Sequence, residues 1–152
     1  MGNSNTSMES IKLKNKKDIF SVLWTFLSVN YILCDVLSNM EASVLKGLLA
    51  GNTAGIEMNQ GFLLVAAISL EIPFVMIVLS KVLKFRANKI MNISAGLLMA
   101  IYQIGSFFVG SAPSLHYIFF SVIEIACNLF IVYYALKWSQ PSQNIEHKNL
   151  EA

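Results

Sequence analysis

The sequence predicts an all-α protein, a bundle of four transmembrane helices with both termini in the cytoplasm. Hydrophobic residues make up 55% of the 152 residues, and charged residues only 13%, well below the roughly 25% typical of a soluble domain. The apolar residues fall in long runs rather than in the narrow stripes of a soluble helix. Transmembrane strands would instead show strict alternation over about 10 residues, a pattern that this sequence lacks.

Four apolar runs account for the predicted helices, and they cover residues 19–40, 61–83, 90–110 and 115–138. At about 1.5 Å per residue, each run reaches roughly 30–36 Å, enough to cross a hydrocarbon core of about 30 Å. Together they define one membrane domain, residues 18–138.

The two ends of the chain are polar. Residues 1–17 show no apolar periodicity, and we expect them to form a flexible cytoplasmic tail. Residues 139–152 are also polar, and we expect them to be a disordered cytoplasmic tail.

Basic residues predict how the helices are oriented. They fall before the first run (Lys12, Lys14, Lys16, Lys17), between the second and third (Lys81, Lys84, Arg86, Lys89), and at or after the end of the fourth (Lys137, Lys148). Lys46 alone lies in a loop on the opposite side. Cytoplasmic loops of membrane proteins are enriched in Lys and Arg, so the pattern predicts an N-in, C-in topology in the cell membrane.

Three carboxylates lie within the apolar runs: Asp35, Glu71 and Glu124. An acid costs about 2.5–3.5 kcal/mol at the centre of a helix, and each Leu, Ile, Phe or Val returns about 0.3–0.6 kcal/mol. One acid per helix is therefore tolerable, but it is expected to face the interior of the bundle rather than lipid. Glu71 and Glu124 fall near the predicted midplane, and Asp35 falls nearer the outer surface.

Residues spaced by three or four share one face of a helix, and each predicted helix has one polar or small-residue face. The four faces comprise Trp24, Ser28, Tyr31, Asp35 and Ser38; Gln60, Leu64, Ala67 and Glu71; Asn92, Gly96, Met99, Gln103 and Ser106; and Tyr117, Ser121, Glu124, Asn128 and Ile131. We expect these faces to point at one another.

Two interpretations of the acids remain open, and no Lys or Arg lies at their depth to balance them. Low dielectric favours the neutral carboxyl, and two close acids would share a proton. The first interpretation is a site for a proton, a metal cation or a cationic ligand. In the second, neutral acids hydrogen-bond to Tyr31, Gln103 and Asn128 and hold the helices together.

Pro73 interrupts the second predicted helix beside Glu71. Proline has no N–H and displaces the carbonyl of Ser69, four residues earlier. This position is a candidate hinge, or an ordinary membrane proline of the kind that transmembrane helices tolerate.

Other chemistry has little support in the sequence. Cys34 and Cys127 are far apart, and the chain has no CxxC motif and no Cys/His cluster. His116 and the scattered thiols supply no nucleophile–base pair. We therefore expect no enzymatic activity, no metal or other cofactor and no nucleic-acid partner. The expected partners are the lipid bilayer and, because so small a bundle has a narrow interior, a second copy or a larger membrane complex.

Several short segments resemble one family of small membrane proteins. They are Leu23-Trp24-x-Phe26, Asn30-Tyr31, Asp35 and Met40; Glu71-Ile72-Pro73-x-x-Met76-x-x-Leu79-Ser80; Arg86-x-Asn88 with Asn92-Ile93-x-Ala95-Gly96; and Tyr117-Ile118-Phe119-Phe120 with Ile123-Glu124-Ile125-Ala126-Cys127. The chain resembles an uncharacterised bacterial family with four transmembrane helices, a domain of unknown function. It is similar to the DoxX-like group only in size and helix count. The resemblance implies the fold and a prokaryotic source, and it implies no reaction.

Two functional hypotheses follow. In the first, the protein is a small proton- or cation-linked transporter or channel-like protein. Glu71 and Glu124 are its mid-membrane acids, and Asp35 is their outer partner. In the second, it is a non-catalytic membrane subunit or scaffold that assembles with a larger complex, and the acids serve as hydrogen-bond glue.

Overall fold

Helices dominate the computed structural model, which describes residues 3–53, 56–108 and 112–139, with side chains from residue 11 onward. The elements are α1 (Asn3–Asn39), α2 (Ala42–Leu49), β1 (Asn52–Thr53), β2 (Ile56–Glu57), α3 (Gln60–Val82), α4 (Phe85–Ser106) and α5 (Leu115–Leu136). The predicted all-α class is confirmed. The predicted disordered tail, apart from residue 139, lies outside the described residues.

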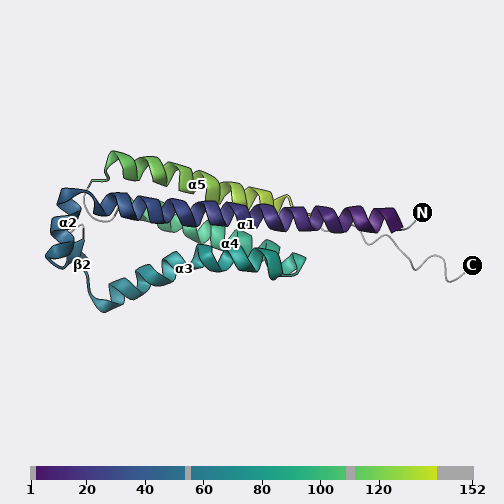
Figure 1. Ribbon diagram of the computed structural model, residues 1–152, viewed down its shortest axis with the longest axis horizontal. Helices are drawn as coiled ribbons and strands as arrows, with labels where there is room; N and C mark the ends of the chain where they lie inside the picture. Colours follow the sequence, from purple (N-terminus) through teal and green to yellow (C-terminus); the bar gives the residue numbers. More distant parts are fainter. Residues whose placement is uncertain (1–2, 54–55, 109–111, 140–152) are drawn as a thin grey trace, which may run out of the picture.

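The four long helices lie lengthwise beside one another (Figure 1). α4 packs along α5, α1 packs along both α3 and α5, and α3 has a smaller contact with α4. The buried apolar cluster at the centre of these contacts includes Phe20, Trp24, Met76, Ile131 and Trp138. The ring of Trp138 packs against the rings of Phe20 and Phe85, which holds the end of α5 against α1 and the start of α4.

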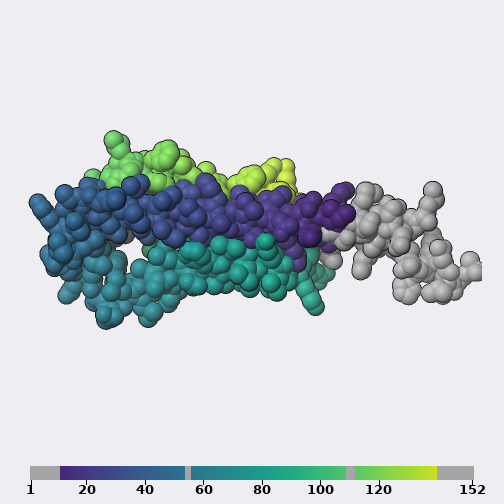
Figure 2. Space-filling model, in the orientation of Figure 1, coloured from purple at the N-terminus to yellow at the C-terminus, as the bar shows by residue number. Residues whose placement is uncertain are grey.

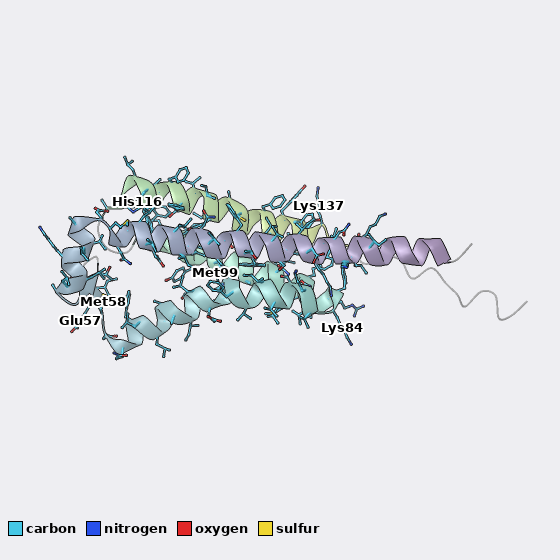
Figure 3. All side chains as sticks on the ribbon, in the orientation of Figure 1. Glu57, Met58, Lys84, Met99, His116 and Lys137 are labelled. Atoms are coloured by element: carbon cyan, nitrogen blue, oxygen red, sulfur yellow. The ribbon has the colours of Figure 1, made fainter. Side chains whose placement is uncertain are left out.

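The two ends of the bundle differ in charge and in chain connections. The turn between α3 and α4 and the last residues of α5 form one end, where Lys84 and Lys137 lie (Figure 3). We call this the basic end. At the opposite end, α2 and the antiparallel pair β1–β2 join α1 to α3, and Glu57 and His116 lie there (Figure 3). We call this the hairpin end.

The structure differs from the expected flexible tail at the amino terminus, because α1 already begins at Asn3. The segment before residue 19 is rich in Lys and contains no Pro or Gly from residue 3 onward, and Lys, Leu, Met and Glu are good helix formers. A helix can therefore form there without an apolar stripe. α2 and the two short strands differ from the expected loop between the first two apolar runs.

Three of the described helical segments are long and apolar enough to cross a membrane: Ile11–Asn39, Gln60–Val82 and Leu115–Leu136. Their outward faces carry large exposed apolar side chains, such as Val65, Ile68 and Val78 on α3. Exposed apolar surface of this extent is unusual for a soluble monomer. The protein therefore has the character of a membrane protein.

Candidate functional site

A cavity of about 250 Å³ lies in the half of the bundle nearest the hairpin end, and α1, α3, α4 and α5 all contribute to it. Figure 2 shows the surface hollowed between α1 and α3 in this region. The lining comprises Tyr31, Cys34 and Asp35; Phe62, Ala66, Ser69 and Leu70; Met99, Tyr102, Gln103 and Ser106; and Tyr117 and Glu124.

The course of α3 explains why the cavity is at this end. Figure 1 shows α3 bending about halfway along, with its first half leaning away from α1. Pro73 lies in this part of the helix and is buried, and a proline inside a helix removes a backbone hydrogen bond and kinks it. After Pro73 the helix packs closely through Met76 and Ser80. Before it, the bundle is open, and whether Pro73 also acts as a hinge stays a prediction.

Glu124 is the most unusual residue in the cavity wall. It lies on α5, nine residues after Leu115 and so about 13 Å along the helix, and its side chain is 1% exposed. Its Oε1 atom has no hydrogen-bond partner among the described residues. A buried polar atom without a partner costs about 1–3 kcal/mol, more when charged, so a native structure that keeps one calls for an explanation.

Asp35 lines the same cavity nearer its mouth. It lies four residues before the end of α1, so about 6 Å from the hairpin end, and its side chain is exposed. Asp35 and Glu124 thus belong to one cavity, as the sequence predicted for acids on facing helices. Asp35 stands near the entrance and Glu124 deeper inside.

The predicted supporting residues are all buried, and they bond to their neighbours. Asn128 Nδ2 donates to the Tyr31 hydroxyl oxygen at 2.8 Å, which joins α5 to α1. Gln103 Nε2 donates to Ser121 Oγ at 2.7 Å, which joins α4 to α5. These bonds fix the walls of the cavity, and none of them reaches the carboxylate of Glu124. Asn128 Oδ1 is also without a partner among the described residues.

The mouth of the cavity is braced by a further pair of bonds. The Tyr117 hydroxyl donates to Ser106 Oγ at 2.5 Å, and Ser106 Oγ donates to the backbone oxygen of Gln103 at 2.6 Å. Tyr117 shares the face of α5 that carries Glu124. The ring of Tyr117 and the hydroxyl groups of Tyr117 and Ser106 therefore lie between Glu124 and the hairpin end.

Glu71 is not part of this cavity, and the prediction that it faces the interior is wrong. It is exposed and lines a separate apolar groove between α3 and α4, beside Ile68, Val75 and Leu98. The packed face of α3 runs instead through Pro73, which is two residues and hence about 200° around the helix from Glu71. Leu64 and Ala67, which share the predicted polar face of α3 with Glu71, are exposed as well.

A second polar cluster lies in the half of the bundle nearest the basic end. Trp24 Nε1 donates to Asn92 Oδ1 at 2.7 Å, and Asn92 Nδ2 donates to Asn88 Oδ1 at 2.6 Å. Asn88 Nδ2 donates to the backbone oxygen of Ser80 at 2.5 Å. We call Trp24, Ser80, Asn88 and Asn92 the asparagine cluster. All four side chains are buried, and each one is hydrogen-bonded.

Part of the cavity lining was not predicted from the sequence. Phe62, Ala66 and Ser69 come from a face of α3 that the polar pattern did not mark, although their spacing of four and three residues matches that of Pro73 and Met76. Tyr102 also lines the cavity, and the helical pattern gave no signal for it. In the part of the chain that the structure describes, no group of three or more His, Cys, Asp or Glu residues is placed to hold a metal ion.

The chain is thus a small helical bundle with membrane-spanning character, and a buried acid lines a cavity in the half nearest the hairpin end. The chain belongs to the Family of unknown function (DUF6326), whose model matches residues 10–144. No curated protein and no solved structure matches the chain. The predicted membership of a family without an assigned activity is thereby confirmed. A bacterial source and the likeness to the DoxX-like group stay predictions.

Proposed function

We propose that the protein is a four-span integral protein of the cell membrane that binds a proton or a cation at Glu124. It would act as a small proton- or cation-linked transporter or channel-like protein. The observation that carries this proposal is the Glu124 carboxylate, 1% exposed, with an oxygen that has no partner among the described residues, in the wall of a cavity. The proposal assigns no catalytic step to these residues.

The distribution of charge supports an N-in, C-in topology. Lys84, Arg86, Lys89 and Lys137 lie at the basic end, and Lys46 lies on α2 at the hairpin end. By the positive-inside rule the basic end faces the cytoplasm. The cavity then lies in the outer half of the bundle.

α4 is the proposed fourth span, although its polar residues lower its hydropathy. Asn88, Asn92 and Gln103 are all buried against the other helices, so they need not meet lipid. The outward side of α4 carries Leu98 and Ile101, which are exposed. A helix of 22 residues with this division of faces can cross the hydrocarbon core as part of a bundle.

The geometry favours a path in which an entering cation meets Asp35 first and Glu124 second. Asp35 at the mouth would attract the cation from the outer side, and Glu124 would bind it inside, where the lower dielectric strengthens the interaction. Beyond Glu124, fully buried Trp24, Leu27 and Ile131 fill the bundle toward the basic end. Transport would therefore require a rearrangement, and the bend of α3 at Pro73 is the proposed place for it.

Ion flux in liposomes tests the proposal. Purified protein would be reconstituted, and the decay of an imposed proton, Na⁺ or K⁺ gradient would be followed with fluorescent indicators. We expect flux through the wild-type protein and a drop of at least tenfold in Glu124→Gln. Glu71→Gln is the matched control, because Glu71 lies outside the cavity, and it should behave like the wild type. Equal flux in both variants would refute the role of Glu124.

A second candidate function has an observation of its own. Glu71 is exposed on an apolar groove of about 450 Å³ between α3 and α4, and an acid facing lipid costs about 2.5–3.5 kcal/mol. A second copy or another membrane subunit that covers the groove would remove this cost. Size-exclusion chromatography of Glu71→Leu against the wild type tests this function, and loss of a larger assembly would support it.

A further inference from the structure

We propose that the ligand of the cavity is a small organic ammonium ion, a protonated amine with an apolar body, rather than a metal ion. The inference rests on the proposed cation site at Glu124 and names the chemical class of the cation. The charges of the wall, the volume of the cavity and the nature of its remaining lining each support it.

The charges of the wall select a cation. Glu124 and Asp35 line the cavity, and no Lys, Arg or His is found among its described lining residues. Oε1 of Glu124 is buried and has no hydrogen-bond partner among the described residues, so an N–H group of the ligand would satisfy it once the side chain turns toward the cavity. Hydrogen bonds between an ionised donor and a carboxylate are roughly twice as strong as those between neutral groups.

The volume selects a ligand larger than an ion and smaller than a typical drug. The cavity measures about 250 Å³, whereas pockets for drug-sized ligands run to roughly 300–1,000 Å³. A dehydrated metal ion would leave most of this space without contacts. An amine with an apolar body of about six carbon atoms would fill the cavity far better.

The remaining lining suits an apolar body and a cationic head. Phe62, Leu70 and Met99 offer apolar contacts. Tyr31 and Tyr117 place aromatic rings on the same cavity, and aromatic faces attract ammonium groups. A bound amine would point its nitrogen at Glu124 and its carbon body toward Phe62 and the mouth.

The same lining is poorly suited to a metal. Hard divalent cations take about six or more oxygen ligands, and transition metals prefer clusters of His, Cys, Asp and Glu. Glu124 and Asp35 are the two carboxylates in the lining, and they come from different depths. Across residues 3–53, 56–108 and 112–139, no group of three such ligands is close enough to hold a metal.

Isothermal titration calorimetry on the purified full-length protein in detergent micelles tests the inference. The probes are cyclohexylammonium, the neutral cyclohexanol of similar size, and K⁺. We expect cyclohexylammonium to bind at least tenfold more tightly than either of the other two. Its affinity should fall at least tenfold in Glu124→Gln, an isosteric change, and should stay within twofold of the wild type in Glu71→Gln.

A second variant tests the cavity without touching its charges. Ala66→Phe places a ring on the half-buried inward face of the first half of α3, where the bundle is open enough to accept it. We expect this variant to keep its helical circular dichroism and to lose binding of cyclohexylammonium at least tenfold.

Three results would overturn the inference: no binding of cyclohexylammonium to folded protein, equal binding to Glu124→Gln, or equal binding of K⁺. The flux assay separates these failures from a failure of the proposed function. If flux of protons or alkali ions depends on Glu124 but the amine does not bind, the proposed cation site is supported and only the organic ligand is refuted. Loss of both would remove the cation site itself.

Discussion

The two polar clusters of the bundle differ in how their hydrogen-bonding groups are used. In the asparagine cluster, near the basic end, each side chain finds a partner, and the bond from Trp24 to Asn92 joins α1 to α4. Around the cavity, near the hairpin end, Glu124 is equally buried, and its Oε1 atom finds no partner among the described residues. α1, α3 and α4 contribute to both regions, and α5 contributes to the cavity as well.

Burial of polar groups alone therefore does not mark a functional site. Interhelical hydrogen bonds in membrane proteins contribute on the order of 1 kcal/mol each, and the asparagine cluster is well explained by that role. Oε1 of Glu124 receives no such support from the described residues. A group that costs stability and lies beside open space is better explained by ligand binding.

The largest expected effect comes from a change that breaks both regions at once. Gly96 lies on α4 one turn after Asn92, and a Cβ there would meet Val132 Cγ2 at 2.8 Å and the backbone oxygen of Asn128 at 3.2 Å. Gly96→Leu should separate α4 from α5 and lower the free energy of unfolding by about 3 kcal/mol or more. Thermal unfolding in detergent, followed by circular dichroism, measures this.

Gly105 supplies the control for this substitution. It is on the same helix, but a Cβ there would meet nothing within 4 Å. Gly105→Leu should leave stability unchanged or slightly raised, because leucine has the better helix propensity. Equal destabilisation by the two substitutions would show that the close approach of α4 and α5 is not what matters.

The next effect tests the asparagine cluster alone. Asn92→Leu keeps the size of the side chain but leaves Trp24 Nε1 and Asn88 Oδ1 without their partners. We expect a loss of about 2 kcal/mol in the free energy of unfolding, measured by unfolding in mixed detergent micelles. The Asn92→Leu protein that remains folded should still bind the ligand. Loss of binding by folded Asn92→Leu protein would show that the asparagine cluster contributes to ligand binding.

The third effect has the opposite sign, because it removes a polar group that lacks a partner. Glu124→Met replaces a buried carboxyl, whose Oε1 has no partner among the described residues, by an apolar side chain of similar length. We expect the free energy of unfolding to rise by about 1 kcal/mol, while flux and amine binding are lost. A stability that falls instead would indicate that Glu124 holds the helices together, as Asn92 does.

The smallest effect is expected at the surface of the basic end. Lys81 Nζ lies 3.7 Å from Asp18 Oδ1, and both side chains are about half exposed. Exposed pairs of this kind contribute about 0–1 kcal/mol, so Asp18→Asn should change the unfolding midpoint very little. A large drop would mean that α1 and α3 depend on this pair rather than on their buried contacts.

Polar periodicity predicted three of the four inward faces. On α5, Ser121, Glu124 and Asn128 are buried as their spacing indicated, because polar residues in an apolar run have few places to go other than the interior. The same reasoning placed Asn92 and Gln103 on α4. On α1 it placed Trp24 and Tyr31 inside and Asp35 at the cavity.

On α3, polar periodicity predicted the wrong face. Glu71 is the only ionisable residue in the middle of this helix. A single acid is too weak a signal to predict which face of a helix is buried. On α3 the buried face is set by the packing of Pro73, Met76 and Ser80. The spacing of polar residues also did not predict the cavity. The cavity depends on the direction that the chain takes before Pro73, and helix spacing carries no information about such a bend.

α1 is longer than any bilayer requires. Its 37 residues extend about 55 Å, against about 40–45 Å for a membrane with its headgroup regions. In the proposed orientation, its first turns therefore project into the cytoplasm as a rigid lever, while its last turns form a wall of the cavity. Any tilt of α1 that accompanies binding would be magnified at the amino terminus, so a spectroscopic label on that end could report occupancy of a site on the far side of the membrane.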